Sequence, residues 1–139
     1  MKFKDIKVED EVYDIINISM GVWSNSYNSF FIKREVTKVT PKQFEVKGRD
    51  CKFRKEDGTA VGGKGELYLE GETYTGWRHN VTGTVKDQTE DAIRFKDLVS
   101  KYTNLSIMIS DLNLTANQLE DNRHLINSVY DCLKLLKGE

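Results

Sequence analysis

The hydrophobic pattern changes its period once, near Gly83, and this change constrains the fold more than any other feature of the chain. Before it, apolar residues alternate with polar ones in short runs such as Gln43-Phe44-Glu45-Val46, which is typical of half-buried strands. After it, apolar residues recur every three or four positions, which is typical of amphipathic helices. The sequence therefore predicts an α+β chain with a small β domain over residues 1–84 and a helical domain over residues 85–139.

The first part contains several short β-rich segments separated by turn signals. Pro41 suits the second position of a tight turn, because its ring holds φ near −65°. The alternation breaks at 48–50 and resumes out of phase, which predicts a bulge or a tight bend. These segments predict a small antiparallel barrel or rolled sheet, and they cover residues 6–18, 30–40, 43–47, 51–53, 66–70 and 74–81. Residues 30–40 form either one strand or a bent pair.

The second part predicts two helices, over residues 88–112 and 116–137, that form an antiparallel hairpin. Thr115 followed by Gln118 has the spacing of a capping box, and Gly138 lies where a helix commonly ends. The apolar stripes are too wide for a hairpin to bury within itself. Either the hairpin docks on the barrel or it pairs with a second copy, and we expect a homodimer through residues 88–137.

Charge is distributed unevenly along the chain. Residues 33–55 carry nine basic side chains against three acidic ones, a net charge of +6, whereas the whole protein carries −1. The rest of the chain therefore carries −7. A concentrated basic segment in a slightly acidic protein indicates a local surface for an anionic partner.

This basic segment predicts a face that binds DNA or RNA. If Phe44, Val46, Cys51 and Phe53 point into the core, alternation directs four cations predominantly outward, Lys47, Arg49, Lys52 and Arg54. There they can neutralise phosphates. Three aromatic residues in surroundings that predict loops can stack on unpaired bases, Trp23, Tyr27 and Trp77. The alternative is that these residues form ordinary solvated strand faces and core aromatics. The predicted nucleic-acid-binding residues are Lys33, Arg34, Lys38, Lys42, Lys47, Arg49, Lys52, Arg54, Lys55, Trp23 and Trp77.

Catalytic and metal-binding patterns are weak in this sequence. The run 58–65 has the spacing of a phosphate-binding loop as far as Lys64, but Gly65 stands where a hydroxyl must bind magnesium, and a strand-like run follows it instead of a helix. His79 and His124 have no cysteine at ligand spacing. We therefore expect a binding protein without enzymatic activity, metal or cofactor.

Nothing in the sequence predicts a membrane segment or an export signal. There is no apolar run of the roughly 18 residues that a membrane-spanning helix needs, and residues 1–5 lack the apolar stretch of a signal peptide. Cys51 and Cys132 are too few for a disulfide framework, so we expect reduced thiols. These features predict a cytoplasmic protein that makes no contact with a membrane.

Three stretches carry a resemblance to a known family: residues 3–13, 36–46 and 53–58. Residues 3–13 resemble the first strand and turn of small SH3-like barrels of the KOW and Tudor kind, in which a glycine is common at the position of Glu9. Residues 36–46 and 53–58 resemble small accessory proteins of tailed bacteriophages. The resemblance implies an SH3-like barrel, a phage origin, a location in the host bacterial cytoplasm and binding to nucleic acid. The alternative function is inhibition or modulation of a host protein such as a polymerase, a nuclease or a defence factor.

Overall fold

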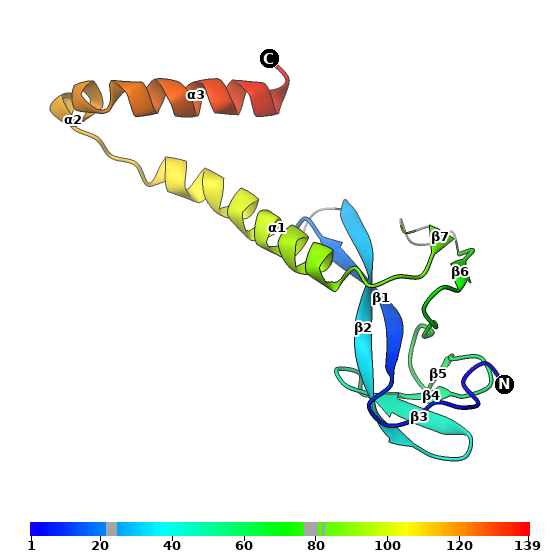
Figure 1. Cartoon of the computed structure of the whole chain (residues 1–139). Coiled ribbons are helices and arrows are strands. Elements are labelled where there is room, and N and C mark those ends of the chain that lie inside the picture. Colours follow the sequence, from blue (N-terminus) through cyan, green and yellow to red (C-terminus); the bar gives the residue numbers. More distant parts are fainter. Residues whose placement is uncertain (22–24, 77–80, 82) are drawn as a thin grey trace. The chain divides into compact units, whose positions relative to one another are not determined.

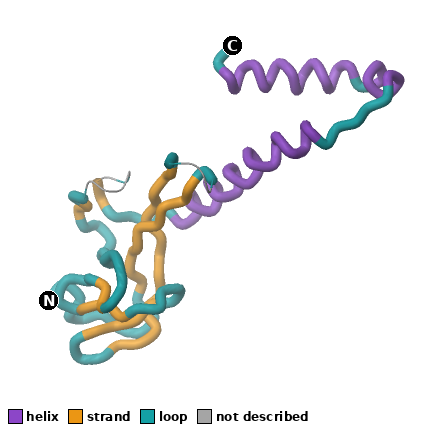
Figure 2. Tube along the Cα trace, turned by 180° about the vertical axis from the view of Figure 1, so that it is seen from behind, coloured by secondary structure: helices purple, strands orange, loops and turns teal. Residues whose placement is uncertain are grey.

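A computed structural model describes residues 1–21, 25–76, 81 and 83–139. A curled antiparallel sheet is followed by helices (Figures 1 and 2), which confirms the α+β class. The strands are β1 (Glu11–Ser19), β2 (Tyr27–Val39), β3 (Gln43–Val46), β4 (Lys52–Arg54), β5 (Ala60–Val61), β6 (Thr73–Tyr74) and β7 (Gly83–Thr84). The helices are α1 (Thr89–Ser110), α2 (Ala116–Asp121) and α3 (Arg123–Lys137).

Two compact units make up the chain, Met1–Tyr102 and Thr103–Glu139. The boundary between them falls within α1, which is a single continuous helix. The division that the sequence predicts after residue 84 stays a prediction.

The five-stranded sheet has the order β1-β2-β3-β4-β5, so each strand pairs with its neighbour in the chain. β2 is 13 residues long and joins the sheet's two halves, because its first part pairs with β1 and its last part with β3. The sequence left open whether residues 30–40 form one strand or a bent pair. They belong to one strand whose register shifts between Val36 and Lys38, and such an irregularity bends a strand.

The sheet packs two hydrophobic clusters, one on each side of β1. Val12 is fully buried in the first cluster, and its neighbour Tyr13 is buried in the second. Successive side chains of a strand point to opposite faces, so burial of both residues requires cover on both faces of β1. The first cluster contains Phe3, Val12, Val36, Phe44, Val46, Phe53 and Leu67, and the second contains Tyr13, Phe31, Tyr68, Val81 and Val85.

The strand predicted over residues 66–70 is reduced to isolated bridges. Tyr68 and Tyr13 exchange two backbone hydrogen bonds of 2.8 and 2.9 Å, and Thr59 bridges Glu66. Leu67 is buried in the first cluster. The alternation correctly predicted that Leu67 points inward, but Tyr68, on the opposite face, is buried as well, in the second cluster. The segment meets its neighbours at single residues. The strand predicted over 74–81 extends partly outside the described residues.

The glycine-rich run 58–65 joins sheet segments and leads into no helix. Gly58 has a φ of +81°, and a Cβ on it would lie 2.7 Å from the carbonyl oxygen of Leu67. Only glycine fits this position without displacing backbone. β5 lies within the run, and Glu66 bridges back to Thr59, so the geometry of a phosphate-binding loop is absent here.

The helices end close to where the sequence predicts. In the capping box, the Gln118 N–H donates to Thr115 Oγ1 at 3.2 Å and the Thr115 N–H donates to Gln118 Oε1 at 3.0 Å. Gly138 ends α3 with a φ of +81°. The prediction of one helix over 116–137 is wrong, because Asn122 divides this segment into α2 and α3. No helix in the described part of the chain is long and apolar enough to cross a membrane.

Candidate nucleic-acid interface and an adjacent pocket

The outward side of β2, β3 and β4 carries most of the exposed cations of the basic segment. Phe44 pairs with Phe53 and both are buried, so their neighbours in the strands point away from the core. We call this side the outer β face, and its charged residues are Lys38, Lys47, Lys52, Arg54 and Glu45.

Strand register arranges these charges. Lys38 lies opposite Glu45, and Gln43 lies opposite Arg54. The same antiparallel register places Lys52 across from Glu45, so one carboxylate lies between two lysines. The separation of 3.9 Å between Lys38 Nζ and Glu45 Oε2 is a loose ion pair. With Lys42 exposed in the preceding turn, the outer β face keeps an excess of positive charge.

Four other cations of the predicted set have partners or are buried. Lys33 Nζ lies 3.3 Å from Asp87 Oδ2, and the hydrogen bond to this carboxylate raises the pKa of Lys33. Lys55 is buried, with 8% of its surface exposed. Arg34 and Arg49 both bind Asp14. The sequence predicted Lys33, Arg34 and Lys55 by charge and Arg49 by charge and strand alternation, and the roles of all four in binding stay predictions.

Asp14 is the carboxylate that joins two distant arginines. Its Oδ2 accepts a hydrogen bond of 2.6 Å from Arg34 Nε and one of 3.1 Å from Arg49 Nη1, while its side chain is only 5% exposed. Two guanidinium groups on one carboxylate leave a net charge of +1. Burial lowers the pKa of Arg49, but the charge and hydrogen bond of Asp14 outweigh it and raise that pKa above its ordinary value.

Arg49 also lines a pocket. Its Nη2 donates to the carbonyl oxygen of Lys64 at 2.5 Å, and its guanidinium carbon lies 5.2 Å from the ring centroid of Phe53. The prediction that alternation directs Arg49 outward does not describe this side chain, because residue 49 lies in the turn between β3 and β4.

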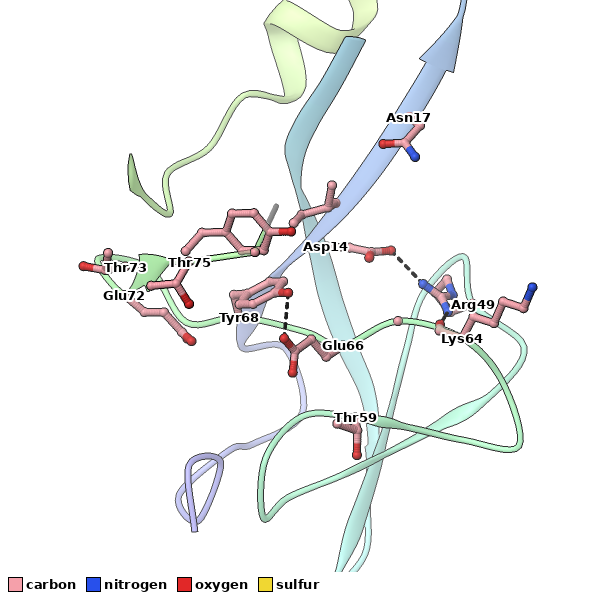
Figure 3. Close-up of a pocket in the computed structure, with 14 residues that line it drawn as sticks. Asp14, Asn17, Arg49, Thr59, Lys64, Glu66, Tyr68, Glu72, Thr73 and Thr75 are labelled. Atoms are coloured by element: carbon pink, nitrogen blue, oxygen red, sulfur yellow. Dashed lines mark hydrogen bonds and ion pairs between the residues drawn. The ribbon is translucent and has the colours of Figure 1, made fainter. Parts of the chain in front are cut away.

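The pocket has a volume of about 900 Å³ and lies within the first compact unit (Figure 3). Asp14 and Arg49 lie at one end and Glu72, Thr73 and Thr75 at the other, and between them Glu66 points toward Tyr68. The Tyr68 and Tyr74 rings meet edge to face, with centroids 5.5 Å apart. The whole lining consists of Asp14, Ile15, Asn17, Arg49, Thr59, Lys64, Gly65, Glu66, Tyr68, Glu72, Thr73, Tyr74, Thr75 and Gly76.

Tyr68 is held by charged groups around it. Its hydroxyl donates to Glu66 Oε1 at 2.8 Å, and the ammonium of Lys2 lies 5.0 Å from its ring centroid. Lys2 Nζ also lies 2.6 Å from Glu72 Oε1. Burial, followed by the hydrogen bond to Glu66, strongly raises the pKa of Tyr68, so this hydroxyl stays protonated as a donor.

Sequence reasoning missed both Asp14 and the pocket. One signal was present for Asp14, since it interrupts the apolar run 12–16, and a charge within such a run requires a partner. The pocket had no local signal, because it combines β1, the β3–β4 turn and residues 59–76. Trp23, Trp77 and His79 lie outside the described residues. Among those described, no group of three metal-binding side chains comes together.

Comparison with known proteins gives no further guidance. No protein-family model, no curated protein and no solved structure matches the chain.

Proposed function

We propose that this chain is a non-enzymatic accessory protein of a tailed bacteriophage that binds DNA or RNA through the outer β face and self-associates through its helices. One observation carries the binding proposal: Lys52 and Arg54 in β4 and Lys47, the residue that directly follows β3, are all exposed. None of the three has an acidic partner within 4 Å among the described residues.

Phosphate binding accounts for this arrangement. Each exposed cation that contacts a phosphate releases condensed counterions, and this gain does not depend on base sequence. The side chain of Arg54 is oriented by two hydrogen bonds of 3.1 Å, to Thr59 Oγ1 and the Ala60 carbonyl oxygen. The expected activity is therefore salt-dependent binding that tolerates many sequences.

Two features support an SH3-like, KOW-type identity for the β domain. The sheet is antiparallel, curled and connected strand to strand. Glu9 has a φ of +78°, and it is the only described residue other than glycine with a positive φ. Barrels of this kind commonly have glycine at that position, which is the residue best suited to left-handed backbone.

Charge reversal tests the binding proposal. The variant Lys47→Glu/Lys52→Glu/Arg54→Glu should bind a single-stranded or double-stranded oligonucleotide at least tenfold more weakly at about 50 mM salt. The slope of log K against log salt should also fall by about 2 to 3, because each phosphate contact contributes roughly 0.7 to 0.9. Fluorescence anisotropy across a salt series measures both quantities.

A matched variant controls for the change in total charge. Lys4→Glu/Lys7→Glu/Lys86→Glu reverses three exposed lysines outside the outer β face and outside the proposed dimer segment and should keep most of the affinity and slope. Equal losses in the two triple variants, or no binding by the wild-type protein at low salt, would refute the proposed interface.

The helical part carries the proposal of self-association. Every residue of 103–139 except Asn122, Ile126 and Leu133 is exposed, and none is buried. Exposed apolar patches of this extent mark interaction sites. The apolar side chains concerned include Leu105, Met108, Leu112, Leu119, Leu125, Val129, Tyr130, Leu135 and Leu136.

A second copy in antiparallel orientation fits the helix dipoles of this segment. Glu120 and Asp121 lie near its start, and Lys134 and Lys137 lie in the last turn of α3. Antiparallel pairing of two copies aligns the helix dipoles favourably. It also brings Glu120 and Asp121 of each copy toward Lys134 and Lys137 of the other, but Asp131 and Glu139 offset these two lysines, so the dipoles carry the argument. We therefore propose a homodimer through residues 88–137, which includes the predicted hairpin.

Sedimentation or light scattering decides the oligomeric state. The wild-type protein should have twice the monomer mass at micromolar concentration, and Leu125→Glu/Val129→Glu/Leu136→Glu should be monomeric. Asn127→Glu/Ser128→Glu adds charge to the same helix and should remain dimeric. A monomeric wild-type protein would refute self-association and favour the second candidate function, in which the same apolar side chains bind a host polymerase, nuclease or defence factor.

A further inference from the structure

Two side chains of opposite charge line the pocket without an ion-pair partner. Lys64 is exposed and Glu66 is half-buried, and neither forms an ion pair within the described part of the chain. They are two residues apart, yet Figure 3 shows the Lys64 side chain extending beyond Arg49 while Glu66 turns toward Tyr68. The pocket therefore has a cationic part at Arg49 and Lys64 and an anionic part at Glu66, and we call these two parts its cationic end and its anionic end.

The cationic end combines Lys64 with the guanidinium of Arg49. Asp14 balances only one of its two arginines, so the buried cluster retains one positive charge beside the pocket. Arg49 is also held by the Lys64 carbonyl oxygen, which fixes its orientation. A phosphate fits this end, because oriented guanidinium and ammonium groups are the usual phosphate-binding groups of proteins.

The anionic end combines a carboxylate with an apolar wall. Glu66 Oε1 accepts from the Tyr68 hydroxyl, and a carboxylate has several further acceptor positions on its two oxygens. Ile15, Tyr68 and Tyr74 supply apolar surface around it. A carboxylate has no donor, so this end selects a flat group that presents two adjacent N–H donors.

We propose that the pocket binds an unpaired guanine nucleotide of a single-stranded nucleic acid. Glu66 accepts hydrogen bonds from N1–H and from the exocyclic amino group of guanine, and Arg49 and Lys64 bind its phosphate. Adenine, cytosine and uracil each present an acceptor beside their donor on this edge, so they leave a carboxylate oxygen facing a lone pair. Reading unpaired bases on their Watson–Crick edge is the usual basis of specificity for single strands.

This inference rests on the proposed function. The outer β face is proposed to bind phosphates without distinguishing the bases, and the pocket adds selection for one base. The pocket volume of about 900 Å³ lies within the range of small-molecule sites, roughly 300–1,000 Å³. The outer β face provides contacts that do not depend on sequence, and the pocket provides contacts that do.

Titration with GMP, AMP, CMP and UMP tests the proposal by calorimetry. GMP should bind at least tenfold more tightly than the other three. Glu66→Gln should reduce this preference to within about twofold, because the glutamine side chain replaces one acceptor by a donor while its oxygen still accepts from Tyr68. Glu70→Gln makes the same chemical change at an exposed residue outside the pocket lining and should keep the preference for GMP.

Three results would overturn the inference: equal affinity for the four nucleotides, an unchanged preference in Glu66→Gln, or binding of lysine amide in place of GMP. Thermal melting followed by circular dichroism should show that Glu66→Gln remains folded. Lys64→Ala provides a second test, since it should weaken GMP binding by at least threefold without perturbing a buried group. An unchanged affinity for GMP in this variant would also count against the site.

The two proposals can fail separately. The triple charge reversal on the outer β face should lower oligonucleotide affinity and leave GMP binding intact. Glu66→Gln should keep the salt-dependent binding of oligonucleotides and lose only the preference for guanine. If GMP selection is absent while salt-dependent binding persists, the pocket proposal is wrong and the proposed interface stands.

Discussion

The Oδ2 atom of Asp14 lies 3.1 Å from Nη1 of Arg49, a residue 35 positions further along the chain. The same oxygen binds Arg34 Nε at 2.6 Å. β1, β2 and the turn after β3 are thus tied together at one nearly buried carboxylate. Asp14 and Arg49 also line the pocket, so the same carboxylate connects Arg34 of β2 to the pocket wall.

Removing this carboxylate should destabilise the β domain. Asp14→Asn keeps the shape of the side chain but leaves two partly buried guanidinium groups without their anion. We expect a loss of about 3 kcal/mol in the free energy of unfolding, as for other broken buried ion pairs. Urea unfolding measures it. Asp50→Asn, at an exposed site, should cost less than about 0.5 kcal/mol, and equal effects in the two variants would contradict the role of Asp14.

The backbone at Glu9 offers a stabilising substitution. A non-glycine residue with a φ of +78° is strained, and Glu9→Gly should relieve this strain and raise the free energy of unfolding by up to about 1 kcal/mol. Asp5→Gly is the control, because Asp5 lacks a positive φ and glycine there should only increase the entropy of the unfolded chain. A destabilised Glu9→Gly protein would rule out this explanation.

The capping box should determine the start of α2. Thr115→Ala removes the acceptor for the Gln118 N–H, and loss of such a cap costs about 1 kcal/mol. Because α2 has only six residues, we expect faster hydrogen exchange at residues 116–121 and a small loss of helical circular dichroism. Ser128→Ala, inside α3, should not accelerate exchange in α2.

Acid should weaken the contact between β2 and the start of α1. Hydrogen bonds, first from the Thr89 hydroxyl and then from its N–H and Lys33, lower the pKa of Asp87. The unfolded chain therefore binds this proton more tightly than the folded protein does. The stabilisation is complete above the unfolded pKa of about 4 and is lost as the pH falls through the lower folded value.

Asp87→Asn tests this pH dependence. Because Asp87 is over one-third exposed, with 36% of its side chain accessible, solvent screening limits its contribution to less than about 1 kcal/mol. The wild-type protein should lose more stability between pH 5 and pH 3 than the variant does, in parallel urea titrations. Identical pH profiles would show that this carboxylate adds no acid-dependent stability.

Much of the local structure could be predicted from the sequence. Alternation correctly placed Phe44, Val46 and Phe53 in the core, and the spacing of Thr115 and Gln118 correctly predicted a capping box. These features depend on residues within a few positions of one another. The break at Asn122 was not predicted, because the apolar repeat continues across it.

The candidate site was less predictable. Lys47, Lys52 and Arg54 are exposed as alternation suggested, whereas Arg49 turns back to Asp14 and Lys55 is buried. The sequence shows which side chains carry positive charge, but it does not show which of them are exposed or which form ion pairs. A salt bridge joins partners that strand register brings together, and register depends on the whole packed sheet.

The sequence by itself determined the change from strand to helix, the inward-facing residues of β3 and β4, and the helix caps, because each follows from short-range periodicity and local hydrogen bonding. Only the tertiary structure decided which cations remain exposed, that Asp14 holds two arginines, and that Glu66 and Lys64 line one pocket. Those relationships link segments far apart in the chain, and packing of the two hydrophobic clusters brings these segments together.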